Sequence, residues 1–180
     1  NLIIDPKIKS AVVASHSRPD GDAYGSNIGI SGVLESLGVK VYSAIDDYPQ
    51  VNFSKMPSPL KNLTASAFIQ RPEKVEKSLA KDNITTSDHS IITDTAMPDL
   101  TTENELKLLA KSKQIIIIDH HEEVSEEKTN EEVWKETFAK YGADPNKVIY
   151  WREERASAAE MVGEIDREVL EESKQKTIAQ

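Results

Sequence analysis

Short runs of apolar, mostly β-branched residues recur along the chain and predict five β-strands. Several runs are apolar at nearly every position, which is typical of strands that are covered on both faces of a parallel sheet. The predicted strands are Ala11–Ser15, Val39–Ile45, Ser90–Thr93, Gln114–Ile118 and Lys147–Trp151. Strands of this kind need helices on both sides of the sheet, so helical patterns are expected between them.

Three such helical patterns are present. Between residues 30 and 37 the apolar positions have i, i+3, i+4, i+7 spacing, and Gly38 supplies a C-terminal stop. Thr101–Lys111 begins with threonines and glutamate, as a capping box does, and ends in lysine. Ala156–Leu170 carries its apolar residues on one face. Strands alternating with helices predict an α/β fold: a doubly wound, mostly parallel five-stranded sheet flanked by helices.

Two segments depart from this alternation. Residues 46–65 contain three prolines and little periodicity, and predict a long loop. Residues 122–146 predict a helical insertion, in which the charge run EEVSEEK should face solvent and an amphipathic pattern surrounds Val133, Trp134 and Phe138. The chain has no internal repeat, and its 180 residues fit one domain spanning 1–180.

Composition and charge limit the kinds of partner and chemistry that the chain can have. The net charge of −9 argues against a long duplex nucleic acid, which needs a basic stripe, but allows a small phosphorylated ligand. The absence of cysteine excludes disulfides, thiolate zinc and a cysteine nucleophile. No apolar run approaches the roughly 20 residues of a membrane helix, and NLIIDPKIKS lacks the apolar segment of a signal peptide. We therefore expect a cytoplasmic protein without a membrane partner, while a monomer and a homodimer both stay open.

Acidic and histidine residues follow three of the predicted strands. The set comprises His16, Asp20 and Asp22 after the first strand, Asp94 after the third, and Asp119, His120 and His121 after the fourth. In a doubly wound sheet, ligands bind at the carboxyl ends of the strands. We therefore expect these three clusters to meet at one edge of the sheet.

This donor set predicts a pair of divalent metal ions. Carboxylates and imidazoles without sulfur suit manganese, magnesium or iron. Gly21 lets Asp20 and Asp22 aim at different ions, and two ions about 4 Å apart can clamp a phosphoryl group. Each element also has a plainer interpretation, because Asp20 or Asp22 could cap a helix that begins near Ala23, and Asp94 could be structural. The three clusters together favour the metal site.

The motifs SHSRPDGDAYGS, DTA and IDHH, in this order, resemble the first three motifs of the DHH phosphoesterase superfamily. The first motif is most similar to that of the nano-RNase/pAp-phosphatase branch, and less similar to those of the RecJ exonucleases and the manganese-dependent pyrophosphatases. Residues 46–59 and ASAAEMV at 156–162 resemble a loop and a serine-rich helix start of the same branch. The resemblance covers about residues 10–170. It implies phosphoester hydrolysis with Mn²⁺, or with Mg²⁺ as the alternative.

The resemblance also implies a role for each residue of the site. Five side chains would hold two ions through one bridging carboxylate: His16, Asp20 and Asp94 for the first ion, and Asp94, Asp22 and His120 for the second. Asp119 would orient the neighbouring histidines. His121 would reach the substrate phosphate or the leaving group. Arg18 would pair with a phosphate, or would otherwise be a solvated loop charge.

The sequence departs from the family pattern near its end. The family normally carries a fourth motif with a further Asp, and a second domain whose glycine-rich GGGH-type loop recognises the substrate. Neither is found before the sequence ends at TIAQ, so we expect the C-terminal substrate-recognition domain to be absent. The expected function is a metal-dependent phosphoesterase acting on small phosphorylated nucleotides, or as an exonuclease on short oligonucleotides. The alternatives are a catalytically incomplete metal- or nucleotide-binding module and, as a weaker fit, a manganese-dependent pyrophosphatase.

Overall fold

The computed structural model describes residues 5, 7–45 and 69–178, with side chains described for residues 5, 7–45 and 70–171. The loop predicted over residues 46–65 lies outside this part. In chain order the elements are β1 (Ser10–Ser15), α1 (Gly21–Ser36), β2 (Lys40–Ala44), β3 (Ile69–Gln70), α3 (Pro72–Lys81), β4 (His89–Thr93), η2 (Pro98–Leu100), α4 (Glu103–Leu109), β5 (Gln114–Asp119), α5 (Asn130–Lys140), η3 (Pro145–Lys147), β6 (Val148–Arg152) and α6 (Ala158–Ile178).

The strands form one sheet in the order β3-β2-β1-β4-β5-β6, and every neighbouring pair is parallel. Five of these strands are the predicted ones, so the α/β fold with a parallel sheet flanked by helices is confirmed. The sixth, β3, is only two residues long and pairs with the end of β2. A strand this short leaves no periodic pattern in the sequence, and it could not have been predicted.

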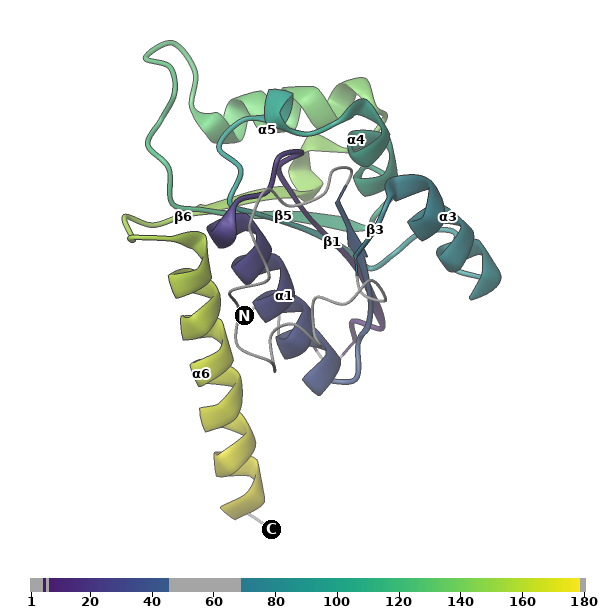
Figure 1. Cartoon of the computed structure of the whole chain (residues 1–180), viewed down its shortest axis with the longest axis vertical. Helices are drawn as coiled ribbons and strands as arrows, with labels where there is room; N and C mark the ends of the chain where they lie inside the picture. The colour runs from purple at the N-terminus through teal and green to yellow at the C-terminus, as the bar shows by residue number, and fades with distance from the viewer. Residues whose placement is uncertain (1–4, 6, 46–68, 179–180) are drawn as a thin grey trace.

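Helices cover both faces of the sheet, and successive residues of β1 show how. Val12 and Ala14 pack into one apolar cluster with residues of α3, α4 and α5. Ala11 and Val13 pack into a second cluster with residues of α1 and α6. Figure 1 shows α1 and α6 side by side on one side of the sheet and α4 and α5 on the other. Burial on both faces explains why the strands read as continuous apolar runs.

The predicted helices are present, with adjusted bounds. The Thr102 side chain and Glu105 form a capping box at the start of α4. Gly38 follows α1 with a φ of +80°, a conformation that glycine adopts without strain, which confirms it as the stop. One helix, α3, was not predicted. Its buried apolar face consists of little more than Val75 and Leu79, which is a weak signal in a highly charged segment.

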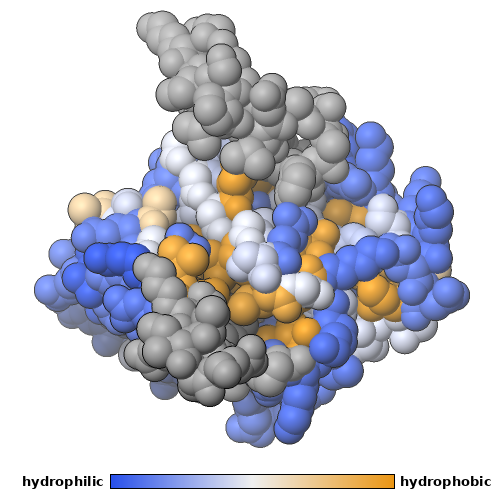
Figure 2. Space-filling view, turned by 90° about the horizontal axis from the view of Figure 1, so that it is seen from below, coloured by the Kyte–Doolittle hydropathy of each residue, from blue (hydrophilic) through white to orange (hydrophobic). Residues whose placement is uncertain are grey.

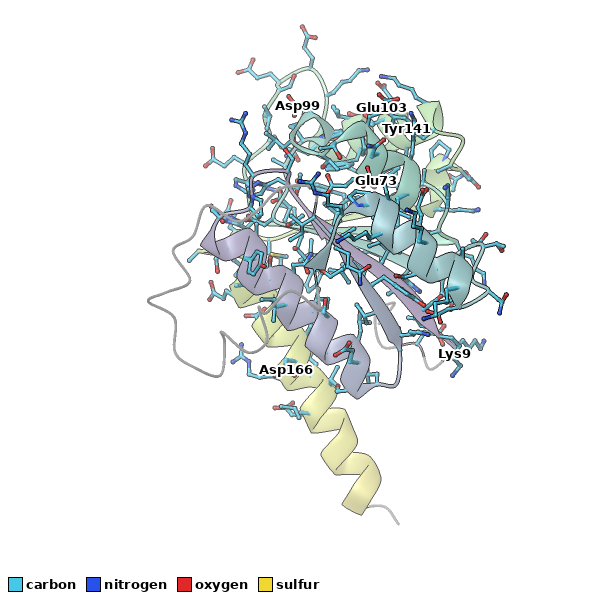
Figure 3. The ribbon with its side chains drawn as sticks, turned by 45° about the vertical axis from the view of Figure 1, so that its right-hand side comes forward. Lys9, Glu73, Asp99, Glu103, Tyr141 and Asp166 are labelled. Atoms are coloured by element: carbon cyan, nitrogen blue, oxygen red, sulfur yellow. The ribbon has the colours of Figure 1, made fainter. Side chains whose placement is uncertain are left out.

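The predicted excursion after β5 contains α5, whose Trp134 and Phe138 are fully buried. The charge run before it lies in a stretch, residues 121–129, in which every residue is exposed, as predicted. Figure 3 shows Glu103 and Tyr141 on this side of the molecule and Asp166 of α6 on the opposite side. The packing of α5 therefore extends the helical layer that contains α4.

The surface combines charged side chains with limited apolar areas. Figure 2, a view from below, shows apolar side chains gathered in the middle of one face, with hydrophilic side chains around them. Among the residues whose side chains are described, four large apolar side chains are exposed: Leu37, Leu100, Val124 and Leu170. Within the described residues, no helix has both the length and the apolar character needed to cross a membrane.

Candidate metal centre

The predicted site residues lie at the carboxyl edge of three adjacent strands. The order of the sheet reverses between β1 and β4, and β5 follows on the far side of β4. Ser15 of β1 pairs with Thr93 of β4, which in turn pairs with Ile118 of β5. The residues that follow these positions therefore leave the sheet at the same level, where ligands of doubly wound sheets bind.

Asp94 lies at the centre of this edge. Its side chain is almost fully buried, and its backbone N–H donates to the carbonyl of Ile118 at 2.9 Å. Its φ of +56° is a left-handed conformation that aspartate and asparagine tolerate better than most residues. Oδ2 lies 3.8 Å from Nε2 of His16, and Oδ1 lies 3.2 Å from Nε2 of His120. The turn after β4 thus aims one carboxylate at histidines from two other strand ends.

Among the residues that the structure describes, two groups of three side chains bring potential ligand atoms within 4.8 Å of one another. The first group is His16, Asp20 and Asp94, and the second is Asp94, His120 and His121. Asp94 belongs to both. A carboxylate shared by two donor groups has the arrangement expected of a bridging ligand between two ions.

The electrostatics of this cluster favour a cation. Burial, followed by the charges of Asp22 and Asp20, raises the pKa of Asp94 to about 7, against the opposing effect of His121 and His120. Burial also lowers the pKa of His16, and the nearby Asp20 only partly offsets this effect. Near neutral pH, ionising Asp94 therefore costs free energy, and a divalent cation between these groups would remove that cost.

His120 is oriented as a metal-ligating histidine is. Its Nδ1 lies 3.3 Å from the carbonyl oxygen of Arg155, which can only accept a hydrogen. In the neutral ring the lone pair is then on Nε2, which lies 3.2 Å from Oδ1 of Asp94 and 3.4 Å from Oδ2 of Asp22. Three electron-rich atoms this close need a proton or a cation between them. The donor set therefore fits a hard or borderline divalent ion.

Asp20 caps a helix, as one of the two interpretations of this residue expected. It is the N-cap of α1, and Oδ1 accepts from the backbone N–H groups of Asp22 and Ala23 at 2.8 and 3.1 Å. Capping uses one oxygen of the carboxylate and leaves the other for a second partner. The capping role and the ligand role of Asp20 are therefore compatible.

Asp22 caps a different helix from the one expected. Its two oxygens accept from the backbone N–H groups of Ala158 and Ala159, each at 2.8 Å, at the start of α6. The same carboxylate lies beside His120. Its place in the second ion's ligand set stays a prediction, and the contact with α6 fixes where that carboxylate lies.

His121 is held away from a ligand role at Nδ1. This nitrogen lies 2.6 Å from Oδ1 of the fully buried Asp119 and donates to it, because a carboxylate only accepts. Burial alone would lower the pKa of His121, but the hydrogen bond and charge of Asp119, with Asp94, raise it overall. His121 is about half exposed. It is therefore a group that can hold a proton at the mouth of the site.

Two buried or half-buried residues that sequence reasoning missed support this pair. The Tyr150 hydroxyl donates to Oδ2 of Asp119 at 2.6 Å, and the Asn130 side-chain amide donates to the Tyr150 oxygen at 3.1 Å. Tyrosine in a strand and asparagine at a helix start are ordinary, so neither gives a signal alone. Arg18, by contrast, is exposed on the loop between β1 and α1, and its phosphate role stays a prediction.

A cavity of about 490 Å³ opens beside the second donor group. Its lining is polar and contains charges of both signs: His120, Glu122, Arg152, Glu154, Arg155, Ala156 and Glu160. Arg152 also donates through Nε to the carbonyl of His121. The cavity gives the site a volume in which part of a small ligand could lie.

Fold and site together define an α/β domain that gathers carboxylates and imidazoles at the switch point of a parallel sheet. Residues 10–180 match the DHH family, N-terminal domain, and the chain belongs to this family. The resemblance of its motifs to the DHH superfamily is thereby confirmed, while the nano-RNase/pAp-phosphatase branch stays a prediction.

Among solved structures, the fold is similar to that of an exopolyphosphatase-related protein from Bacteroides fragilis, with a TM-score of 0.51 and 21% sequence identity. The match covers 78% of this chain and 44% of that protein, so the chain spans less than half of its length. At this level of identity the likeness concerns the fold. No curated protein matches the chain.

Proposed function

We propose that this domain is the metal-binding part of a phosphoesterase that hydrolyses small phosphorylated nucleotides or short oligonucleotides. The observation that carries the proposal is the position of Asp94, a buried carboxylate with one oxygen near Nε2 of His16 and the other near Nε2 of His120. Membership of the DHH family agrees with it. So does the description of the Bacteroides fragilis protein as exopolyphosphatase-related, since phosphoesters and phosphoanhydrides pose the same problem of charge at phosphorus.

In this proposal, two ions, Mn²⁺ or alternatively Mg²⁺, occupy the site. The ligands are His16, Asp20 and Asp94 for the first ion, and Asp94, Asp22 and His120 for the second. When bound, the ions supply Lewis acidity at the phosphoryl group and lower the pKa of a water molecule. The chain's own contribution is positioning, because backbone hydrogen bonds fix Asp20 and Asp22 before any ligand arrives.

Of the remaining residues, His121 and Arg18 would act on the substrate. His121 holds a proton on the side of the site that faces solvent, and it would bind the phosphate or protonate the leaving group. Asp119 orients it. Arg18 would pair with a phosphate, and the cavity beside His120 would take the part of the substrate attached to the scissile phosphate. Burial of Asp94 and Asp119 keeps the charged groups in a fixed, poorly solvated arrangement.

The test is hydrolysis of pAp and of a short RNA with Mn²⁺, by the wild type and by Asp94→Asn. Asparagine keeps the shape and tolerates the positive φ of this position. Loss of a side chain that supports a metal ligand typically lowers metal affinity or activity about 10–100-fold. Loss of the shared carboxylate itself should therefore lower turnover at least about 100-fold. Asp166→Asn makes the same chemical change at an exposed position of α6 (Figure 3) and should leave turnover unchanged.

Two outcomes would contradict the proposal. Equal turnover in Asp94→Asn and the wild type would remove the metal centre from the chemistry. Saturable Mn²⁺ binding without hydrolysis of pAp or RNA would favour the alternative, a metal- or nucleotide-binding module. Pyrophosphate and polyphosphate belong in the same assay, because preference for either would replace the nucleotide substrate by an inorganic one.

A further inference from the structure

The last strand of the sheet holds the DHH segment from one side. In the register of β5 and β6, Ile117 pairs with Tyr150 and Asp119 pairs with Arg152. Tyr150 reaches the Asp119 carboxylate, and Arg152 reaches the backbone carbonyl of His121. Two alternate residues of β6 therefore contact both ends of the Asp119–His121 segment.

The Asp119 carboxylate is divided between two partners. Oδ2 accepts from the Tyr150 hydroxyl and Oδ1 accepts from Nδ1 of His121, both at 2.6 Å. The carboxylate is fully buried, so neither oxygen can exchange its partner for water at low cost. Because the group is planar, fixing Oδ2 also fixes the direction in which Oδ1 points. The orientation of the His121 ring thus depends on a hydroxyl group that does not touch it.

Asn130, at the start of α5, fixes Tyr150 in turn. Its Nδ2 donates to the Tyr150 oxygen at 3.1 Å and to the carbonyl of Glu122 at 3.2 Å, while its Oδ1 accepts from the backbone N–H of Val124. The residue is almost fully buried, although the loop before it is exposed. Asn130 therefore ties Tyr150 to the chain immediately after His121.

We propose that Tyr150, supported by Asn130, is a positioning residue for His121: its hydroxyl fixes the Asp119 carboxylate, which fixes the imidazole at the metal centre. The proposal rests on the proposed function, because it assigns His121 a task in the reaction. It concerns residues outside the metal-ligand set. The segment between β5 and β6 would then contribute to the site, because its residue Asn130 fixes Tyr150.

The test compares Tyr150→Phe with a matched control elsewhere in the sheet. Tyr42 of β2 donates to Oδ2 of Asp82 at 2.6 Å, the same distance and the same pair of groups. Tyr42→Phe therefore removes a tyrosine–aspartate hydrogen bond on a strand that β1 and β4 separate from β5, although Asp82 is partly exposed and its Oδ2 also pairs with Lys40. We expect kcat to fall about 10–100-fold in Tyr150→Phe and to change less than about twofold in Tyr42→Phe. Mn²⁺ affinity should stay within about threefold in both, because neither tyrosine is a proposed ligand.

A double-mutant cycle separates positioning from general damage. If Tyr150 acts through His121, Tyr150→Phe should cost nothing more in a His121→Ala background. If the two substitutions reduce kcat independently, so that their fold reductions multiply in the double mutant, the proposal is overturned. Equal kcat values in Tyr150→Phe and Tyr42→Phe would also overturn it.

A readout that needs no turnover distinguishes this proposal from the proposed function. In metal-free protein, nitrogen NMR of the imidazole should show a protected Nδ1–H on His121 in the wild type and in Tyr42→Phe. In Tyr150→Phe its solvent exchange should accelerate at least about tenfold. Faster exchange in Tyr150→Phe, in a protein that hydrolyses none of the substrates, would support the positioning role of Tyr150 and contradict the proposed phosphoesterase activity. Unchanged exchange in an active enzyme would do the reverse.

Discussion

Asp94 combines burial, a left-handed backbone and two acidic neighbours in one residue. Each of these features costs free energy in the metal-free fold, and a carboxylate that only stabilised the fold would not need them together. Such concentrations of strain and charge are typical of functional positions. The residue therefore links the stability of the metal-free domain to pH.

The pH dependence of metal-free stability follows from Asp94. Its pKa is raised to about 7 in the folded state from an ordinary value of 3.8. Its contribution to stability is then full below pH 3.8 and is lost as the pH rises to about 7. Asp94→Asn should therefore stabilise the metal-free protein at pH 8, by on the order of 1–3 kcal/mol, and much less at pH 4.5.

Urea unfolding with a chelator present, at both pH values, measures this difference. Asp166→Asn is the control, because it makes the same substitution at an exposed position of α6 (Figure 3), outside the cluster around Asp94. If the Asp94→Asn and wild-type curves keep the same separation at pH 4.5 and pH 8, burial of this carboxylate does not set the stability of the metal-free fold.

At the scale of elements, the close packing of α1 on α6 determines where the Asp22 carboxylate of the candidate site lies. A Cβ added at Gly29 would lie 2.9 Å from Cγ1 of Val162, so the two helices approach closely there. Near their N-termini, Asp22 of α1 caps α6. A change in the distance between these helices would therefore move the Asp22 carboxylate, which lies beside His120.

Alanine at two glycines of α1 tests this packing. In an open helix position, Gly→Ala stabilises by about 0.5–1 kcal/mol, and Gly32, which has nothing within 4 Å, should show this gain. Gly29→Ala should lose it, because overpacking against the stiff, β-branched Val162 costs about 1–3 kcal/mol. Thermal unfolding of the two variants measures the contrast. Equal gains would mean that α6 shifts freely on α1.

The same scale shows why sequence reasoning found most elements and missed others. The strands were predictable because two-sided burial leaves continuous apolar runs, and α4 was predictable because its cap is local, from Thr102 to Glu105. The helix α3 and the short β3 were missed because their apolar signal is weak or absent. His16, Asp94 and His120 could be predicted to lie together because they follow strands, and topology brings strand ends together.

The partners of those residues could not be read in the same way. Tyr150 lies 31 residues from Asp119, and Ala158 lies 136 residues from Asp22. Both contacts depend on strand register and helix docking, which no local pattern encodes. The sequence therefore predicted which side chains lie together, and the structure shows what holds them in place.

At the scale of the whole molecule, metal binding and folding should be coupled. The chain carries a net charge of −9, and several of its acids converge on one edge of the sheet. An ion that binds only the folded state stabilises it by about 2.7 kcal/mol at 100 times its Kd. For a domain of this size, that corresponds to a rise in Tm of about 5–10 °C.

Calorimetry with and without Mn²⁺ measures this rise in Tm. In Asp94→Asn the rise should be largely lost. NaCl at equal ionic strength is the control, because general screening of surface charge would act on both variants alike. A rise in Tm of the same size in Asp94→Asn would place the binding outside the proposed site.

The contact between Asp22 and the start of α6 also has a consequence for the order in which the protein is made. Ribosomes add about 5–20 residues per second, and 136 residues separate Asp22 from Ala158. The first motif therefore waits roughly 7–27 s in the nascent chain before the backbone that holds it has been synthesised. The proposed ligand set is therefore incomplete during that interval, and all of its supporting backbone is present only after translation has passed the start of α6.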